Sequence, residues 1–147
     1  MSINDIRRTS ENKLIGVIRI ILGIIFLITG AMKLFIPMFT EAWLGQLVQA
    51  GVPLITFNFF FVPFAEIVLG LLLLKGFYTR FLTLTIFPIM LVAIYIHITV
   101  EDAGLFPLQP KLPIIPIVVI IMAIMLLRSG AGALSADLKW TNKNMQT

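Results

Sequence analysis

The sequence predicts an all-α integral membrane protein, a four-helix bundle with both termini on one side of the bilayer. Of its 147 residues, 59% are hydrophobic and only 12% are charged, whereas an average soluble domain is about 45–50% apolar and about 25% charged. The apolar residues also fall into four runs that end at charged or helix-ending residues. A bilayer core needs about 20 apolar residues in a helix, so each run is interpreted as one span of a single domain covering residues 1–147.

The four spans are expected at about residues 14–35, 54–75, 81–100 and 112–128. Basic residues precede the first run, as in a signal peptide, but no small-residue cleavage site follows it, so we expect a retained helix. Eight lysines and arginines fall on the side that holds both termini, against Lys33 and Lys111 on the other. By the positive-inside rule, both termini are expected in the cytoplasm.

Residues 37–53 connect the first two spans and are too short and too polar to cross a membrane. Phe39, Trp43 and Leu47 recur at helical spacing, and Gly51 followed by Pro53 is a helix stop. We expect a short helix in the outer interface, anchored by Trp43. A plain loop is the alternative.

Several kinds of site are excluded by composition. The chain has no cysteine and one histidine, His97, which removes disulfides, iron–sulfur ligation, thiol nucleophiles and a multi-histidine zinc site within one chain. We therefore expect no metal site and no covalently bound cofactor. The basic residues lie at the ends of apolar runs, where they set topology, so nucleic acid is not an expected partner.

The first span carries an ordered stripe on one helical face. Its members follow a spacing of 3, 4, 3, 4 and 3 residues: Gly16, Arg19, Gly23, Phe26, Gly30 and Lys33. Glycines on such a face let a neighbouring helix approach closely, so Gly23 and Gly30, with Gly70 in the second span, are assigned structural roles. The stripe points Arg19 into the bundle, while Lys33 can extend toward the outer surface.

Two prolines inside spans are also assigned structural roles. Pro63 and Pro88 each free the carbonyl four residues earlier, on Phe59 and Leu84, because proline has no N–H to donate. A freed carbonyl near a buried charge can line a polar pocket.

Arg19, Glu66 and His97 lie inside spans, where an ionisable group costs a few kcal/mol. At 1.5 Å per residue, Arg19 lies about 8 Å and Glu66 about 13 Å from the cytoplasmic end. We therefore predict an Arg19–Glu66 ion pair, since a pair is cheaper in lipid than two lone charges. Whether such a pair serves chemistry or is a purely structural clasp is left open.

His97 lies near the outer end of the third span, at a depth similar to that of Lys33. A lone membrane histidine can be a hydrogen-bonding strut or a proton donor and acceptor. A site there would suit the polar head of a lipophilic ligand such as a quinone. The candidate catalytic residues are thus Glu66 and His97, and the candidate ligand-binding residues are Arg19, Lys33, Glu66 and His97.

The segment after the fourth span ends the bundle. Gly130 and Gly132 are expected to end the fourth helix, and Ser135 and Asp137 to cap helix ends with side-chain acceptors. The alternative, a nucleotide-binding loop, lacks a strand–loop–helix context and a following Gly-Lys-Ser/Thr.

Taken in order, these motifs resemble the DoxX/DoxD-like family of small four-helix membrane proteins. The resemblance covers roughly residues 14–137. It rests on Arg19-x3-Gly23-x2-Phe26-x3-Gly30-x2-Lys33, on Glu66-x3-Gly70, on the run from Leu74 to Arg80, and on His97. Residues 129–137 are similar to the family's Gly-Pro-Gly-x-x-Ser-Leu-Asp ending, with alanine in place of its proline and leucine.

The resemblance implies a multi-pass protein of a prokaryotic cytoplasmic (inner) membrane. Members include the membrane subunit of a thiosulfate:quinone oxidoreductase and relatives linked to quinone or oxidative-stress resistance. The first hypothesis is therefore a subunit of an oxidoreductase system that binds a quinone or similar lipophilic molecule and works with a soluble or membrane redox partner protein, either as one copy or as a homo-oligomer. The chain shows no redox motif of its own, which leaves enzymatic activity open. The alternatives are a non-catalytic anchor or scaffold and, third, a lipid-ligand isomerase or transporter.

Overall fold

The computed structural model describes residues 6–100 and 112–144, and their regular structure is helical. The bundle consists of four helices, and two shorter helices flank it. The bundle helices are α2 (Lys13–Phe35), α4 (Ile55–Lys75), α5 (Thr79–Thr99) and α6 (Ile114–Ser129), and the shorter ones are α3 (Pro37–Gln49) and α7 (Ala136–Asn144). The all-α prediction is confirmed, and each predicted run is a helix whose ends differ from the expected ones by at most two residues.

The outer faces of the bundle are those of a membrane protein. Helices α2, α4 and α5 are each long and apolar enough to cross a bilayer, and α6 is an apolar helix of 16 residues. Large apolar side chains cover the outward faces, among them Phe60, Leu91 and Ile121, each more than half exposed. In water this would be unfavourable, whereas in lipid these faces are solvated.

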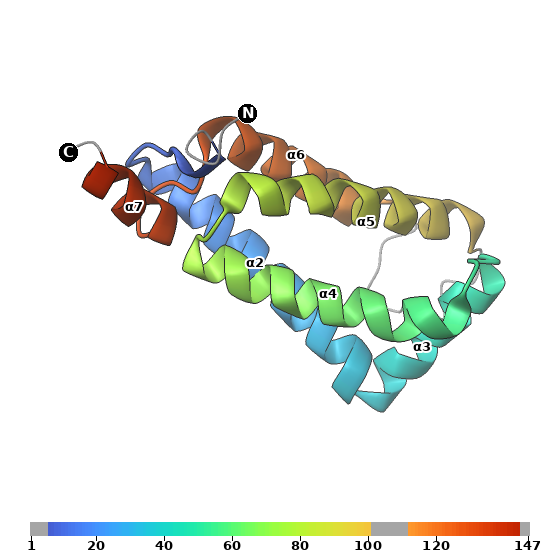
Figure 1. Ribbon diagram of the computed structural model, residues 1–147. Coiled ribbons are helices and arrows are strands. Elements are labelled where there is room, and N and C mark those ends of the chain that lie inside the picture. Colours follow the sequence, from blue (N-terminus) through green and yellow to red (C-terminus); the bar gives the residue numbers. More distant parts are fainter. Residues whose placement is uncertain (1–5, 101–111, 145–147) are drawn as a thin grey trace.

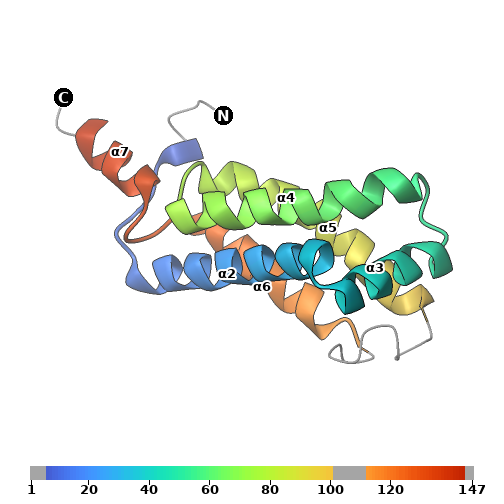
Figure 2. The same ribbon diagram turned by 90° about the horizontal axis from the view of Figure 1, so that it is seen from below.

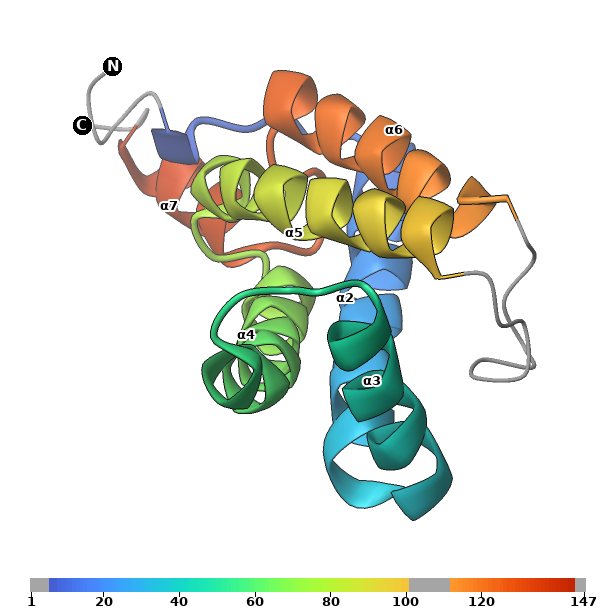
Figure 3. The ribbon, with the colours of Figure 1, turned by 90° about the vertical axis from the view of Figure 1, so that its right-hand side faces the viewer.

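The four bundle helices form two pairs, α2 with α4 and α5 with α6. Figure 1 shows α4 and α5 close together at the turn that joins them and diverging toward the opposite end. Figure 2 shows α6 passing behind α2, and Figure 3 shows α5 and α6 lying across α2 and α4, so that the second pair crosses the first. Leu22, Phe26, Leu73, Ile86 and Leu126 fill the core between the pairs.

The α2–α4 contact depends on the predicted small residues. A Cβ atom added to Gly30 would lie 2.6 Å from the carbonyl oxygen of Pro63, and one added to Gly70 would lie 2.6 Å from the backbone nitrogen of Leu27. No side chain fits at these two positions without separating the helices. The structural assignment of these glycines is therefore supported by the packing.

The helix predicted between the first two spans is present as α3, but its predicted anchor is wrong. Trp43 is 4% exposed and packs against α4 and α5 instead of facing an interface. Its indole N–H donates to the carbonyl of Phe59 at 3.3 Å. Pro63 leaves that carbonyl without a helical donor, and a buried indole N–H needs an acceptor. The role expected of Pro88 stays a prediction.

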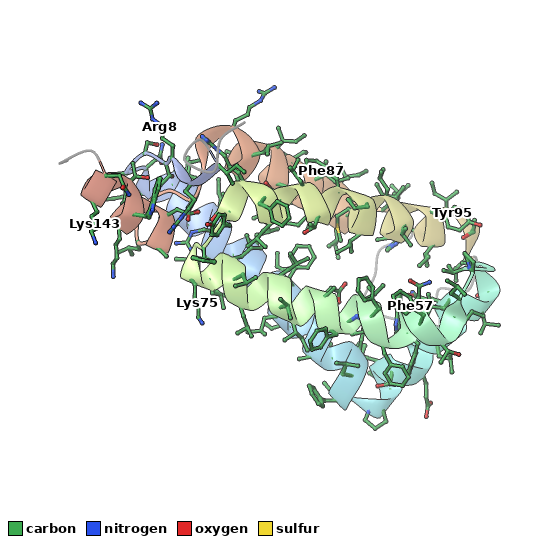
Figure 4. The ribbon with its side chains drawn as sticks, viewed as in Figure 1. Arg8, Phe57, Lys75, Phe87, Tyr95 and Lys143 are labelled. Atoms are coloured by element: carbon green, nitrogen blue, oxygen red, sulfur yellow. The ribbon has the colours of Figure 1, made fainter. Side chains whose placement is uncertain are left out.

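Both described ends of the chain meet at one end of the bundle. The hydroxyl of Thr9 accepts from Gly132 N at 2.9 Å, and that of Thr141 donates to the carbonyl of Arg7 at 3.3 Å. Figure 4 shows Arg8, Lys75 and Lys143 at this end, whereas Phe57 and Tyr95 lie toward the other. The basic side chains thus gather as the topology argument requires, and their cytoplasmic placement stays a prediction.

The segment that follows α6 caps this end as expected. Asp137 accepts hydrogen bonds from the backbone N–H groups of Tyr78 and Thr79, both at 3.0 Å, and from Arg7 Nε at 3.1 Å. Ser135 Oγ accepts from Leu138 N at 3.0 Å, at the start of α7. Gly130 is the C-cap residue of α6. The capping role predicted for this segment is confirmed.

Candidate functional site

Arg19 is fully buried. Its guanidinium hydrogen-bonds to the backbone at the basic end, the end of the bundle where both described chain ends meet. It donates to five carbonyl oxygens within 3.2 Å: those of Leu73, Leu74, Ala131, Ala133 and Leu134. These carbonyls belong to the last turn of α4 and to the loop after α6, where helical donors run out. The carbonyl of Leu73 also accepts from Gly76 N at 2.9 Å. The predicted Arg19–Glu66 ion pair is wrong, because Arg19 is held by carbonyls and Glu66 pairs elsewhere.

The relative positions of α2 and α4 explain the error. The predicted pair assumes that both helices begin at one plane. In the structure Gly76, just after α4, lies beside the Arg19 guanidinium, and Gly30 lies beside Glu66. Helix α2 therefore extends more than one turn beyond the end of α4. Glu66 is ten residues from Gly76, which separates it from the level of Arg19 by about 15 Å along the bundle.

Glu66 instead forms an ion pair with Lys33. Lys33 Nζ lies 2.7 Å from Glu66 Oε1, and the two side chains are 14% and 5% exposed. The same ammonium lies 4.7 Å from the centroid of the Trp43 ring, a cation–π distance. The expectation that Lys33 extends to the outer surface is wrong. Lys33 points into the bundle because it pairs with the buried Glu66, whose carboxylate would be costly there without a partner.

His97 lies across from this pair on α5. Its Nδ1 is 2.9 Å from the carbonyl oxygen of Ala93, one turn earlier. Its Nε2 is buried and has no partner within the described chain, and the same holds for Glu66 Oε2. Two buried polar atoms without partners are unusual in a native structure and require an explanation.

Both atoms belong to residues that line one cavity of about 230 Å³, here called the polar cavity. Its polar side chains are Thr29, Lys33, Glu66 and His97. Its apolar walls come from α2, α3, α5 and α6: Ile25, Phe26, Met32, Phe39, Met90, Ala93, Ile115, Pro116 and Val119. Three of the four predicted ligand-binding residues are thus brought together, and Arg19 is not among the residues that line this cavity.

The fold brings the sequence motifs together. The glycines of the α2 stripe contact α4, and Lys33, Glu66 and His97 line one cavity. The sequence model of the DoxX family matches residues 14–99, which is more than half of the chain. The chain belongs to the DoxX family. No curated protein and no solved structure matches this DoxX protein. The matched range covers α2 to α5, and so includes Lys33, Glu66 and His97.

A second cavity of this DoxX protein adjoins the first and is called the apolar cleft. It has a volume of about 560 Å³ and lies between α4 and α5. It shares Lys33, Glu66 and Ala93 with the polar cavity, and its other walls include Phe64, Leu69, Ile89 and Val92. The ion pair therefore lies at the boundary between a small chamber with polar groups and a larger, almost wholly apolar space.

Two other kinds of site, a further cavity and a metal centre, are less well supported in this DoxX protein. A larger hollow of about 980 Å³ lies beside α4, lined by four phenylalanines and without a charged side chain. No group of three or more histidine, aspartate or glutamate side chains that could hold a metal ion occurs in residues 6–100 and 112–144. The polar cavity and the apolar cleft are thus the candidate site.

The sequence missed Trp43 and Thr29 as members of this site. The ring of Trp43 lies against the Lys33 ammonium, and Thr29 lies one turn before Lys33 on the cavity wall. Thr29 could have been predicted from its spacing, because it lies four residues before Lys33 on α2. Nothing in the local sequence places Trp43 beside Lys33, because α3 must first fold back against α4.

Proposed function

We propose that this DoxX protein is a membrane subunit that binds a quinone-like, lipid-soluble ligand, with its ring in the polar cavity and its apolar tail in the apolar cleft. The observation that carries the proposal is the Lys33–Glu66 pair, which lies at the boundary between the two spaces. Ligand sites are mostly apolar and contain a few placed polar groups that orient the ligand. The two cavities have that composition.

The energetics of the site support a ligand over a purely structural clasp. A buried ion pair often contributes no more stability than apolar residues of the same volume. In this site the pair also leaves Glu66 Oε2 without a partner, as His97 leaves Nε2. A ligand that hydrogen-bonds to these atoms would recover the cost, whereas a clasp alone gives no reason for them.

A quinone would make the protein one component of an oxidoreductase system in a prokaryotic cytoplasmic membrane. The chain has no cysteine, so the electrons would come from a redox partner protein with its own cofactor. The basic end of the bundle offers a positively charged surface. It would attract a partner that carries negative charge or that is bound to anionic lipid headgroups. With α6 as the fourth span, both termini would lie on that side.

The test is purification of the full chain from native membranes in mild detergent, followed by mass spectrometry of bound lipids and proteins. We expect a quinone in the extract, and a higher melting temperature when an alkyl quinone is added. Ala93→Leu should abolish the shift, because Ala93 lines both spaces. Ile98→Phe adds bulk on the same helix at an exposed position and should leave the shift intact.

Two results would overturn the proposal. One is a purified protein that carries no quinone and whose melting temperature does not change with added quinone. The other is an equal shift in wild type, Ala93→Leu and Ile98→Phe, which would mean that the quinone acts through the detergent or the outer surface. A stoichiometric protein partner without any lipid ligand would favour the scaffold function instead.

A further inference from the structure

We infer that the polar cavity selects a head group that donates hydrogen bonds, so that an aromatic diol such as a hydroquinone binds more tightly than the corresponding carbonyl form. The inference rests on the proposed function and concerns the chemical form of the ligand in the same site. It comes from counting which hydrogen-bonding atoms of the cavity are already used.

Glu66 supplies the first unused atom. Its Oε1 accepts from Lys33 at 2.7 Å, so the group is a carboxylate in an ion pair. A carboxylate has no hydrogen to donate. Its second oxygen, Oε2, is buried and without a partner, and the residue as a whole is 4% exposed. This oxygen can be satisfied only by a donor.

His97 supplies the second unused atom. Its Nδ1 lies 2.9 Å from the carbonyl oxygen of Ala93, and a carbonyl can only accept. The hydrogen of the neutral ring is therefore on Nδ1, and Nε2 carries the lone pair. Since Nε2 is buried and without a partner, the cavity presents a second acceptor that also requires a donor.

Of the two remaining polar side chains of the cavity, Thr29 has its hydrogen engaged and Lys33 has part of its hydrogens engaged. The hydroxyl of Thr29 donates to the carbonyl of Phe26 at 3.2 Å. The ammonium of Lys33 donates one of its three hydrogens to Glu66 and faces the ring of Trp43, so it can still donate to a ligand. Among the described residues that line the cavity, Glu66 Oε2 and His97 Nε2 are acceptors without any partner, and the spare donor capacity is that of Lys33.

The two partnerless acceptors distinguish the hydroquinone form of a ring from its quinone form. A hydroquinone carries two O–H donors that can satisfy two acceptors. A quinone carries two carbonyls that only accept. One of them could accept from Lys33, but the quinone would leave both Glu66 Oε2 and His97 Nε2 buried and unsatisfied. Shape and tail are the same in both forms, so the preference follows from the hydrogens alone.

The test measures binding of three ligands with one alkyl tail to the full chain in nanodiscs. They are the hydroquinone, its dimethyl ether and the quinone. The ether is redox-inert and has no donor. We expect the hydroquinone to bind roughly tenfold more tightly than either, or more, the effect of one hydrogen bond to a charged acceptor.

Variants at position 97 assign the preference to the cavity. His97→Phe should reduce the preference for hydroquinone over the ether, and His97→Gln, which keeps an acceptor, should retain more of it. Thr99→Val removes an exposed hydroxyl from the same helix and should change nothing. Comparison of the three ligands on wild type alone remains decisive if a variant does not fold.

The outcomes separate this inference from the proposed function. Equal affinity for the three ligands, or tighter binding of the quinone or the ether, would overturn the inference while the proposed function stands. A preference that is unchanged in His97→Phe would also overturn it. Absence of binding by all three ligands would overturn the proposed function itself.

Discussion

Lys33 on α2 and Glu66 on α4 form an ion pair inside the bundle, with 2.7 Å between Nζ and Oε1. The pair lies where α2 and α4 are in close contact, one turn beyond Gly30, whose missing side chain lets the helices meet. It also forms part of the walls of both cavities. The same two residues thus join the first helix pair and define the chemistry of the candidate site.

Removal of one partner of this pair should destabilise the protein more than removal of both. Lys33→Met leaves the Glu66 carboxylate buried without its cation, which should cost about 3–5 kcal/mol in the free energy of unfolding. The double variant Lys33→Met with Glu66→Gln carries no buried charge and should lose clearly less. The measurement is a double-mutant cycle of unfolding in mixed detergent, with the exposed Lys75→Met as the control. A double variant as unstable as the sum of the single variants would contradict the ion pair.

Arg19 should prove essential for stability and dispensable for ligand binding. Arg19→Gln removes the guanidinium from five carbonyls, of which that of Leu73 keeps the N–H of Gly76 as a donor. The buried acceptors left unsatisfied should cost about 3 kcal/mol or more. The folded fraction should bind the quinone or hydroquinone with wild-type affinity, because Arg19 lies at the opposite end of α2 from Lys33. Arg8→Gln, at an exposed position of the same end, is the control. A loss of affinity with unchanged stability would place Arg19 in the ligand site.

Asp137 should stabilise the start of α5. Tyr78, the residue before this helix, has a left-handed backbone with φ of +51° and no side-chain cap, and Asp137 binds the N–H groups of residues 78 and 79 instead. Asp137→Ala should cost about 2 kcal/mol or more and speed hydrogen exchange at these two amides. Asp137→Asn should fall between, and Asn142→Ala serves as the exposed control. Unchanged exchange at both amides would rule out the cap.

Gly70 should tolerate no larger side chain. A Cβ atom at this position would meet the backbone of α2 at Leu27 and Gly23, which cannot move aside as a side chain can. Gly70→Ala should therefore separate α2 from α4 and lower the melting temperature, with a cost of about 1–3 kcal/mol. Leu71→Ala, at an exposed position of the same helix, should have a small effect. A Gly70→Ala variant as stable as wild type would mean that the two helices do not pack this closely.

Sequence periodicity predicted the helices well and the pairing of charges poorly, for a physical reason. Spans, the glycine face of α2 and the caps at Ser135 and Asp137 depend on residues close in sequence or on one helical face. The partner of Glu66 depends on how far α2 slides along α4. Counting residues from an assumed common plane could not supply that offset, and it joined Glu66 to Arg19 instead of Lys33.

The position of Trp43 shows a second limit of prediction from sequence. A tryptophan on a short helix between spans is typical of an interfacial anchor, and the local sequence supports nothing else. Its burial depends on two distant residues: Pro63, which frees the carbonyl of Phe59, and Lys33, whose ammonium packs on the ring. The expectation that His97 and Lys33 lie at a similar depth agrees with the structure, where both line the polar cavity.

The central claim is that the polar cavity and the apolar cleft bind one lipid-soluble ligand. It is tested most directly by photolabelling the full chain in nanodiscs with an alkyl quinone that carries a diazirine at the ring end of its tail. We predict labelling in the peptides that hold the cavity-lining residues between Ile25 and Lys33 and between Pro88 and His97, and competition by the unlabelled quinone. Labelling of Phe57 and Phe60, which are exposed on α4 and do not line the cleft, without competition by the unlabelled quinone, would contradict the claim.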